Sequence, residues 1–238
     1  MKTKTAGIIG GIGPESTIDY YRSIIAAYRA QKQDGSYPPI IINSIDLKEV
    51  VDLVTANELS KLTDYLVAEV ERLARAGAAF ALLAANTPHI VFEDIRRRSP
   101  IPMFSIVEAT CDAAKALGLK RLGLFGTRFT MQGRFYPDVF SRHGITLALP
   151  DENDQAYIHE KYMSELVNGI FLAATRARLL TIADRLQARE GIQGLILGGT
   201  ELPLLFRDKM ARDATTGGIP FLDTTQIHVK AIVAELLS

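Results

Sequence analysis

The chain has 238 residues, of which 47% are hydrophobic, and its 27 basic side chains balance 27 acidic ones. This length and composition are typical of a globular protein that forms one large domain or two lobes of about 100 to 120 residues. The zero net charge gives no overall field to hold a polyanion or an anionic membrane surface, so we expect neither nucleic acid nor a membrane as a partner.

Hydrophobic runs and cysteine content restrict the class of protein further. No apolar run reaches the roughly 18 residues that span a bilayer, and the N-terminal segment lacks the features of a signal peptide, which predicts a cytoplasmic protein. The only cysteine, Cys111, excludes a disulfide framework and a Cys-based metal site. It shares a face with Val107 and Ala114, so we interpret it as a small buried filler and not a nucleophile. The four histidines have no ligand spacing on one element, and we predict no metal.

Apolar runs and amphipathic segments alternate along the first half of the chain. Residues 5–9 (TAGII) predict a buried strand, and Gly10–Pro14 (GGIGP) breaks it. A helix of about four turns is expected next, because Ser16 and Asp19 resemble a capping box. Its apolar face would hold Ile18, Tyr21, Ile24, Ile25 and Tyr28. We then expect a strand in PPIIINSIDL (38–47), a helix in 59–77 that ends at Gly77, and a strand in FALLAAN (80–86). This alternation favours a parallel sheet covered by helices on both faces.

The second half of the chain repeats this pattern. RLGLFGTR (121–128) resembles the first strand and loop, and GLILGGTE (194–201) resembles FALLAANT (80–87). Gly7 and Gly123 are 123 − 7 = 116 residues apart, and Ala85 and Gly199 are 199 − 85 = 114 apart. The near-equal offsets predict two pseudo-symmetric α/β lobes, one of residues 1–104 and 214–238 and one of residues 105–213. Ligands bind beyond the carboxyl ends of parallel strands, so we expect a ligand cleft between the lobes. Chance similarity between apolar strands is the alternative.

The loop at Gly10–Pro14 could be read as a dinucleotide fingerprint. Gly11, Gly13 and Ser16 approximate G-x-G-x-x-[GA], but Ser16 replaces the third glycine and Pro14 removes a backbone donor. The next acidic residue after a strand, Asp46, lies 46 − 13 = 33 positions on, where about 20 is usual. We therefore expect neither a nicotinamide nor a flavin. The preferred interpretation is a loop whose free N–H groups, with a helix that starts at Thr17, receive a carboxylate.

Polar side chains follow the apolar strands at corresponding points of both halves: Asn86, Thr87, Thr127, Thr200 and Glu201. Any one alone would be an ordinary turn former, but their correspondence favours a binding site. His89 and His228 could each be an acid or base near neutral pH, although a hydrogen-bonded structural role is the preferred interpretation of each. Arg96, Arg97 and Arg98 are explained by favourable interaction with a helix C-terminus in solvent.

Five segments together resemble one known family. These are IIGGIGPEST, ANTPH, LFGTRFTMQGRFY, LGGTELPLL and FLDTTQIHVKA, which span nearly the whole chain in the family's order. They are similar to the aspartate/glutamate (Asp/Glu/hydantoin) racemase family, and most similar to its broad-specificity amino-acid racemase branch. The resemblance implies a pseudo-symmetric pair of α/β lobes with a site between them, no pyridoxal phosphate and no metal. It also leads us to expect a homodimer.

Both catalytic cysteines of that family are missing. Members that racemise carry them in motifs of the form C-N-T and G-C-T-E, and the matching positions here are Ala85 and Gly199. Inversion of a Cα centre without an electron-sink cofactor needs one group that removes the α-proton and another, on the opposite face, that returns one. Each positioned acid or base contributes about 10² to 10⁴ in rate, and neither a methyl group nor a hydrogen atom can supply it.

The remaining family positions are kept. The resemblance implies that Asn86, Thr87, Thr127 and Thr200 bind the amino-acid carboxylate or amine, that Glu201 supports the second thiol position, and that Gly11 and Ser16 form the first substrate loop. Lys48 is a candidate for binding a distal carboxylate.

These observations predict that the protein binds a small acidic amino acid or dicarboxylate and lacks two-cysteine racemase activity. The alternative is an active, cofactor-independent isomerase or lyase with Glu201 or His89 as base. A third interpretation, that the thiols were replaced by design, fits Gly199 poorly, because such replacements are usually Ala or Ser.

Overall fold

The structure is a computed structural model that describes residues 4–210, 215–216 and 218–238. The chain divides into two compact units. Unit 1 consists of residues 1–106 and 225–238, and unit 2 consists of residues 107–224. The expected lobe boundary between residues 213 and 214 lies outside the described residues. No helix in the described ranges is both long enough and apolar enough to cross a membrane.

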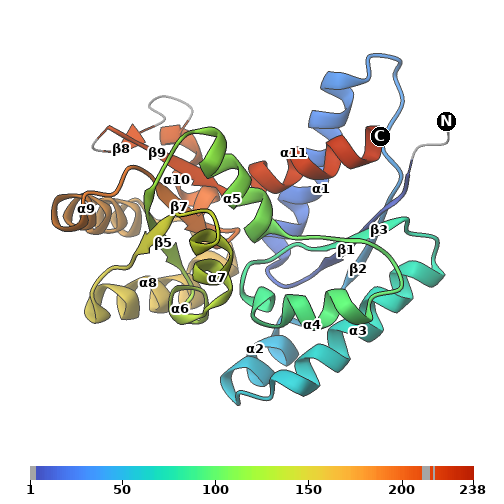
Figure 1. Ribbon diagram of the computed structural model, residues 1–238, viewed down its shortest axis with the longest axis horizontal. Helices are drawn as coiled ribbons and strands as arrows, with labels where there is room; N and C mark the ends of the chain where they lie inside the picture. The colour runs from blue at the N-terminus through green and yellow to red at the C-terminus, as the bar shows by residue number, and fades with distance from the viewer. Residues whose placement is uncertain (1–3, 211–214, 217) are drawn as a thin grey trace. The chain divides into compact units, whose positions relative to one another are not determined.

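Unit 1 contains a four-stranded parallel sheet in the order β2-β1-β3-β4 (Figure 1). Its strands are β1 (Ala6–Gly10), β2 (Ile40–Ser44), β3 (Phe80–Leu83) and β4 (Met103–Phe104). Its helices are α1 (Pro14–Gln31), α2 (Leu47–Thr55), α3 (Leu59–Arg75), the 3-10 helix η1 (Thr87–Val91), α4 (Phe92–Arg98) and α11 (Thr224–Leu237). Strands β1 and β3 are buried at every position, which explains their continuous apolar sequences.

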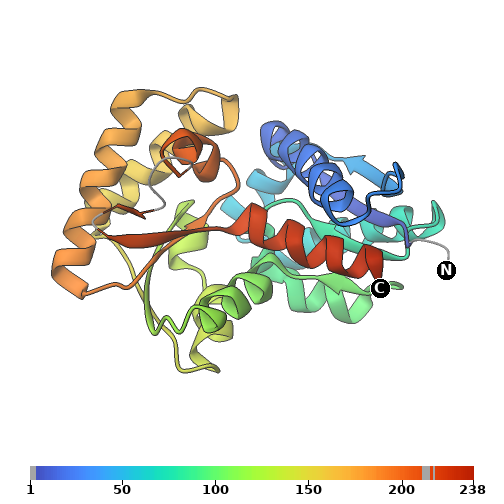
Figure 2. The ribbon, with the colours of Figure 1, turned by 90° about the horizontal axis from the view of Figure 1, so that it is seen from above.

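Helices α1 and α11 lie side by side on one face of this sheet (Figures 1 and 2). Tyr20, Ile24 and Tyr28 of α1 are fully buried there. Two residues expected on this face, Ile18 and Tyr21, are instead 44% and 47% exposed. The burial of Ile24 and Tyr28, four residues apart, was predicted correctly, but the stripe continues to Tyr20, four residues before Ile24, and so passes between the two exposed positions.

Helix α3 follows its sequence pattern closely. The helical spacing predicted one apolar face of Leu59, Leu62, Leu66, Val70 and Leu73, and all of these are buried except Leu59, which is half-buried. The helix ends before Gly77, whose φ of 96° lies in the left-handed region that glycine adopts without strain. The N–H of Gly77 donates to a carbonyl in the last turn of the helix, which confirms the predicted stop.

Unit 2 contains a second sheet, in the order β6-β5-β7-β9-β8. Strands β6, β5, β7 and β9 are parallel, and β8 pairs with β9 in the antiparallel direction. The strands are β5 (Arg121–Gly126), β6 (Thr146–Ala148), β7 (Leu195–Gly198), β8 (Thr215–Thr216) and β9 (Ile219–Asp223). The helices are α5 (Ile106–Ala116), α6 (Arg128–Gln132), α7 (Phe135–Ser141), α8 (Glu152–Ser164), the 3-10 helix η2 (Leu166–Asn168), α9 (Ala173–Glu190) and α10 (Leu202–Met210). The two predicted lobes of α/β class, each with a parallel sheet flanked by helices, are confirmed.

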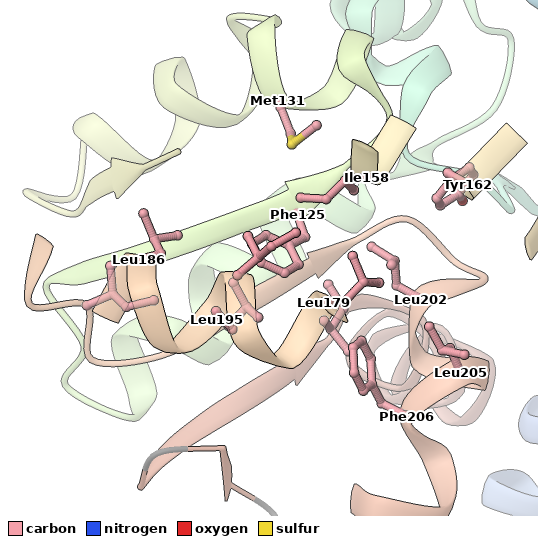
Figure 3. Packing of buried hydrophobic residues seen from close by; sticks show 14 of the residues in the cluster. Phe125, Met131, Ile158, Tyr162, Leu179, Leu186, Leu195, Leu202, Leu205 and Phe206 are labelled. Atoms are coloured by element: carbon pink, nitrogen blue, oxygen red, sulfur yellow. The ribbon is translucent and has the colours of Figure 1, made fainter. Parts of the chain in front are cut away.

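The core of unit 2 joins β5 and β7 to α8, α9 and α10 (Figure 3). Phe125 of β5, Leu197 of β7 and Phe206 of α10 are each at most 1% exposed. Tyr162, near the end of α8, belongs to the same cluster. Cys111 of α5 is 1% exposed, and its burial raises the pKa of the thiol, in agreement with its interpretation as a filler.

Corresponding glycines end the first strand of each unit. A Cβ atom on Gly10 would lie 2.5 Å from Cγ2 of Thr17, and one on Gly126 would lie 2.8 Å from Cγ2 of Thr130. In both units a threonine of the following helix therefore packs directly against the last residue of the strand. The absence of a side chain at Gly10 and Gly126 lets each helix begin immediately beyond its strand.

Candidate functional site

The first group of predicted site residues lies at the carboxyl ends of the strands in unit 1. Strand β1 pairs with β2 and β3 in parallel, with Gly10 opposite Ser44 and Ile9 opposite Leu83. Gly11 and Ala85 therefore follow neighbouring strands at the same edge of the sheet. This is the edge at which open parallel sheets bind ligands.

The loop after β1 is more closed than the sequence suggested. Helix α1 begins at Pro14, whose fixed φ suits a first helical residue, and Gly13 is its N-cap. The buried Ser16 hydroxyl lies 2.8 Å from the Gly13 carbonyl oxygen and 3.2 Å from that of Ala84. The predicted capping box at Ser16 is therefore wrong, because this hydroxyl donates to carbonyl groups and accepts from no backbone N–H at the helix start.

Two N–H groups that were expected to be available to a carboxylate are already used. The Gly11 N–H donates to Thr17 Oγ1 at 2.8 Å, and the Thr17 N–H donates to the Gly13 carbonyl at 3.2 Å. The expectation of a helix that starts at Thr17 with free donors is also wrong. The loop instead positions Ser16 directly against the end of β3.

The residues after β3 combine a small apolar side chain with polar ones. Ala85 is 4% exposed and Asn86 is 3% exposed, while Thr87 is half-buried and begins η1. The Ala85 methyl group has no acid or base function. Asn86 brings a buried amide to the same strand end, where it can both donate and accept hydrogen bonds.

His89 differs from its expected structural role. The ring is 4% exposed and stacks on Phe92, with centroids 4.6 Å apart. Among the described residues neither ring nitrogen makes a hydrogen bond of normal geometry, although the backbone at Asn86 and Ala85 favours the protonated ring slightly. The structure therefore does not support the interpretation of His89 as a well hydrogen-bonded histidine. Burial, with a smaller contribution from nearby His228, lowers the pKa of His89 to about 3. The ring is therefore neutral at pH 7 and a weak base.

His228 matches the structural interpretation. Its Nδ1 lies 2.9 Å from the Tyr20 hydroxyl oxygen, and its Nε2 lies 3.2 Å from the Phe104 carbonyl oxygen. Burial lowers the pKa of His228 to about 3. Both ring nitrogens are thus used to join α11 to α1 and β4.

The second group of predicted residues lies at the strand ends of unit 2. Gly126 of β5 is opposite Gly198 of β7, so Thr127 and Gly199 follow neighbouring strand ends. Thr127 is 6% exposed and caps α6, where its hydroxyl accepts a hydrogen bond from the Thr130 N–H at 3.2 Å. Thr200 and Glu201 are each 1% exposed.

Tyr162 lies against the predicted site residues of unit 2, although no sequence motif marked it. Its hydroxyl donates a hydrogen bond to Glu201 Oε2, which also accepts one from the Thr200 hydroxyl at 3.0 Å. Burial, and then the charge of Glu201, raise the pKa of Tyr162 well above its usual value. A Cβ atom on Gly199 would lie 2.8 Å from the phenolic oxygen and 2.9 Å from Cζ of Tyr162. The tyrosine therefore fills the space that a side chain at position 199 would need.

Lys48 is placed in the first turn of α2, directly after β2. Its side chain is 77% exposed and forms an ion pair with Asp52 one turn later. A role for Lys48 in binding a distal carboxylate remains a prediction. In the described part of the chain, no group of three or more His, Cys, Asp or Glu side chains could hold a metal ion.

Comparisons with known proteins identify the family. The family model for Asp/Glu/hydantoin racemases matches residues 9–232. The broad-specificity amino-acid racemase RacX of Bacillus subtilis is 25% identical over 248 aligned residues, which cover 98% of each chain. The crystal structure of a candidate Asp/Glu racemase from Yersinia pestis has a TM-score of 0.87 at 33% identity, over 99% of this chain and 100% of that one. An aspartate racemase homologue from Pyrococcus horikoshii has a TM-score of 0.81 at 31% identity, with the same coverage. The chain therefore belongs to the Asp/Glu/hydantoin racemase family.

Proposed function

We propose that this protein binds a small acidic amino acid or a related dicarboxylate and does not racemise it by the two-cysteine route. One contrast carries the proposal. The two positions that match the family's catalytic cysteines are Ala85 and Gly199, yet the polar side chains beside them remain buried. These side chains match the positions that hold the amino acid in the family's racemases, so their presence at two strand ends favours ligand binding without the two thiols.

The neighbouring titratable groups are poor substitutes for a thiol pair. With a pKa of about 3, His89 is too weak a base to remove an α-proton efficiently at neutral pH. Tyr162 has a raised pKa and stays protonated, so it cannot act as a base either. Neither His89 beside position 85 nor Tyr162 beside position 199 can therefore replace the base that a thiolate would supply.

A second candidate function is a cofactor-independent isomerase or lyase in which Glu201 is the base. The observation that favours it is the position of this carboxyl group, two residues from Gly199 and oriented by Tyr162 and Thr200. A single base could act on a substrate whose α-proton is more acidic than that of an amino acid. This function requires turnover, whereas the leading proposal requires only binding.

Two measurements separate these functions. Proton NMR in deuterated water should show no enzyme-dependent loss of the α-proton signal of L- or D-aspartate or glutamate. The same acids, at 100 times their dissociation constant, should stabilise the protein by about 2.7 kcal/mol, which is roughly 5 to 10 °C in Tm for a chain of this size. Exchange that is lost in Asn86→Ala would support the enzyme, and no thermal shift with any acidic amino acid, keto acid or dicarboxylate would refute binding.

The family assignment supports two further proposals. The protein functions without pyridoxal phosphate, as the family resemblance implies, and it forms a homodimer. Size-exclusion chromatography with light scattering tests the second, and a mass near the monomer's 26.1 kDa at micromolar concentration would contradict it.

A further inference from the structure

The two missing thiols are replaced in different ways. At the end of β3 a methyl group stands at position 85. At the end of β7 the residue is glycine, and the phenol of Tyr162 occupies the space beside it. Cβ atoms essentially never approach other heavy atoms to less than 3.0 Å, and a Cβ at position 199 would lie 2.8 Å from the phenolic oxygen. The phenol of Tyr162 thus occupies the volume that a side chain at position 199 would need. In the family's motif the residue at this position is a cysteine.

The phenol is held in a defined orientation. Tyr162 lies one turn after Ile158 on the buried face of α8, and its ring is 6% exposed. Its hydroxyl proton is donated to Glu201, and the Thr200 hydroxyl donates to the same carboxylate oxygen. The raised pKa of Tyr162 keeps the phenol neutral at physiological pH.

This arrangement determines which ligand group suits the position. A hydroxyl that donates its proton to a carboxylate offers lone pairs to any further partner. Because both hydroxyl protons point to Glu201 Oε2, the phenolic oxygen, the Thr200 oxygen and the carboxyl oxygens of Glu201 form an acceptor-rich group. A cationic N–H donor gains charge-assisted hydrogen bonds there, whereas a ligand carboxylate, which only accepts, meets no donor in this group.

We propose that Tyr162 takes the place of the second thiol and, together with Glu201, selects acids that carry an α-ammonium group over the same acids without one. This inference rests on the proposed function and narrows it, because it favours amino acids over simple dicarboxylates. Tyr162 and Glu201 are then specificity-determining residues and leave the ligand chemically unchanged.

The test compares matched ligands by isothermal titration calorimetry. Aspartate is paired with succinate, and glutamate with glutarate, so that each pair differs only in the ammonium group. The unmodified protein should prefer the amino acid by at least about tenfold, the effect of one charge-assisted hydrogen bond. Glu201→Gln should remove most of this preference and Tyr162→Phe a part of it, because aspartate affinity falls by a larger factor than succinate affinity in both variants. Tyr136→Phe, at another fully buried tyrosine of unit 2, is the control and should leave the preference unchanged.

The outcomes distinguish the inference from the function on which it rests. If no acid binds, the proposed function fails and the inference fails with it. If succinate binds as tightly as aspartate, or if the preference survives both variants, only the inference is overturned. If Tyr162→Phe does not fold, Gly199→Ala provides the same test, because the added methyl group must displace the phenol and should lower the preference. A folded Gly199→Ala variant with unchanged preference would also overturn it.

Discussion

The Tyr20 hydroxyl oxygen lies 2.9 Å from Nδ1 of His228, which joins α1 to α11 across 208 residues of sequence. The ring planes are perpendicular, with centroids 5.8 Å apart. This contact ties the C-terminal helix to the N-terminal helix inside unit 1. It also separates the roles of the two buried histidines, since His228 has partners for both ring nitrogens and His89 makes no hydrogen bond of normal geometry among the described residues.

The first prediction concerns these two histidines as a matched pair. His228→Leu should lower the free energy of unfolding by roughly 2 to 4 kcal/mol, because the Tyr20 hydroxyl and the Phe104 carbonyl lose a buried partner. His89→Leu should change it by less than about 1 kcal/mol, because no hydrogen bond is lost and a buried polar ring is replaced by an apolar side chain. Urea denaturation of both variants checks this, and equal losses in the two would contradict the assignment of partners.

The second prediction is the pH dependence of stability. In the folded protein each of these histidines has a pKa of about 3, whereas the unfolded value is about 6.5. Between these values the unfolded chain binds more protons, so their contribution to stability is complete above about pH 6.5 and is lost as pH falls toward 3. Urea midpoints measured from pH 7.5 to 5.0 should therefore decrease, with the steepest change below pH 6.5.

A pair of variants tests which groups cause the decrease of the urea midpoint with falling pH. His89→Leu should reduce the slope between pH 6 and 5, because one of the two buried histidines no longer titrates on unfolding. The control is His143→Leu, at an exposed position. An unchanged slope in His89→Leu would show that the buried ring is not the source of the pH dependence.

The third prediction uses two glycines with the same backbone conformation. Gly11 and Gly35 both have a φ of 81°, so an alanine at either position experiences a similar conformational penalty of about 1 kcal/mol. They differ in surroundings. A Cβ on Gly11 would lie 2.7 Å from the Ile45 nitrogen and from Ser44 Oγ, whereas one on Gly35 would meet nothing within 4 Å.

Gly11→Ala should therefore be clearly more destabilising than Gly35→Ala, by an additional 1 to 3 kcal/mol or so, because the backbone of the β1 loop must move away from the end of β2. Differential scanning calorimetry of the two variants gives the comparison. Similar melting temperatures would show that the loop can relax without cost.

The elements that sequence predicted well are those in which local pattern and burial agree. Strands β1 and β3 are buried throughout, and α3 has one apolar stripe, so their patterns could be read directly. The prediction for helix α1 was less accurate, because the helix begins at Pro14 and not at Ser16, and because Tyr20 and not Tyr21 faces the core. Tyr20 and Tyr21 fit a helical stripe almost equally well in the sequence. Only the packing of α1 against α11 determines that Tyr20 is the buried one.

The candidate site shows the same limit. The strand-end positions of Asn86, Thr127 and Thr200 followed from the repeat, because parallel pairing aligns strand ends. Tyr162 could not be found that way, since its relation to Gly199 depends on how α8 packs against β7. In the sequence, Gly199 indicated only that the second thiol is missing. The structure shows in addition that the phenol of Tyr162 occupies the space beside Gly199.

The last prediction concerns restoration of the thiols. In racemases of the family the two sulfurs act on one substrate carbon, so Ala85→Cys with Gly199→Cys would be the direct route to activity. Gly199 is not among the glycines with positive φ in the described residues, so its backbone accepts a side chain without conformational strain. The obstacle is steric, since the new Cβ and sulfur would collide with the phenol of Tyr162.

We therefore expect Gly199→Cys to be destabilised by roughly 1 to 3 kcal/mol from overpacking, and Tyr162→Ala to be destabilised by about 3 to 5 kcal/mol from the cavity it leaves. The double variant Gly199→Cys plus Tyr162→Ala should lose less stability than the two single losses added together, because the new cysteine occupies the cavity left by the phenol.

Exchange of the aspartate α-proton in deuterated water should be measurable only in the triple variant that also carries Ala85→Cys. It should be far smaller in any variant with one thiol. Exchange in Ala85→Cys plus Gly199→Cys with Tyr162 intact would show that the phenol moves aside easily and does not close the second position. Additive stability losses for Gly199→Cys and Tyr162→Ala would show that the two side chains do not compete for the same space.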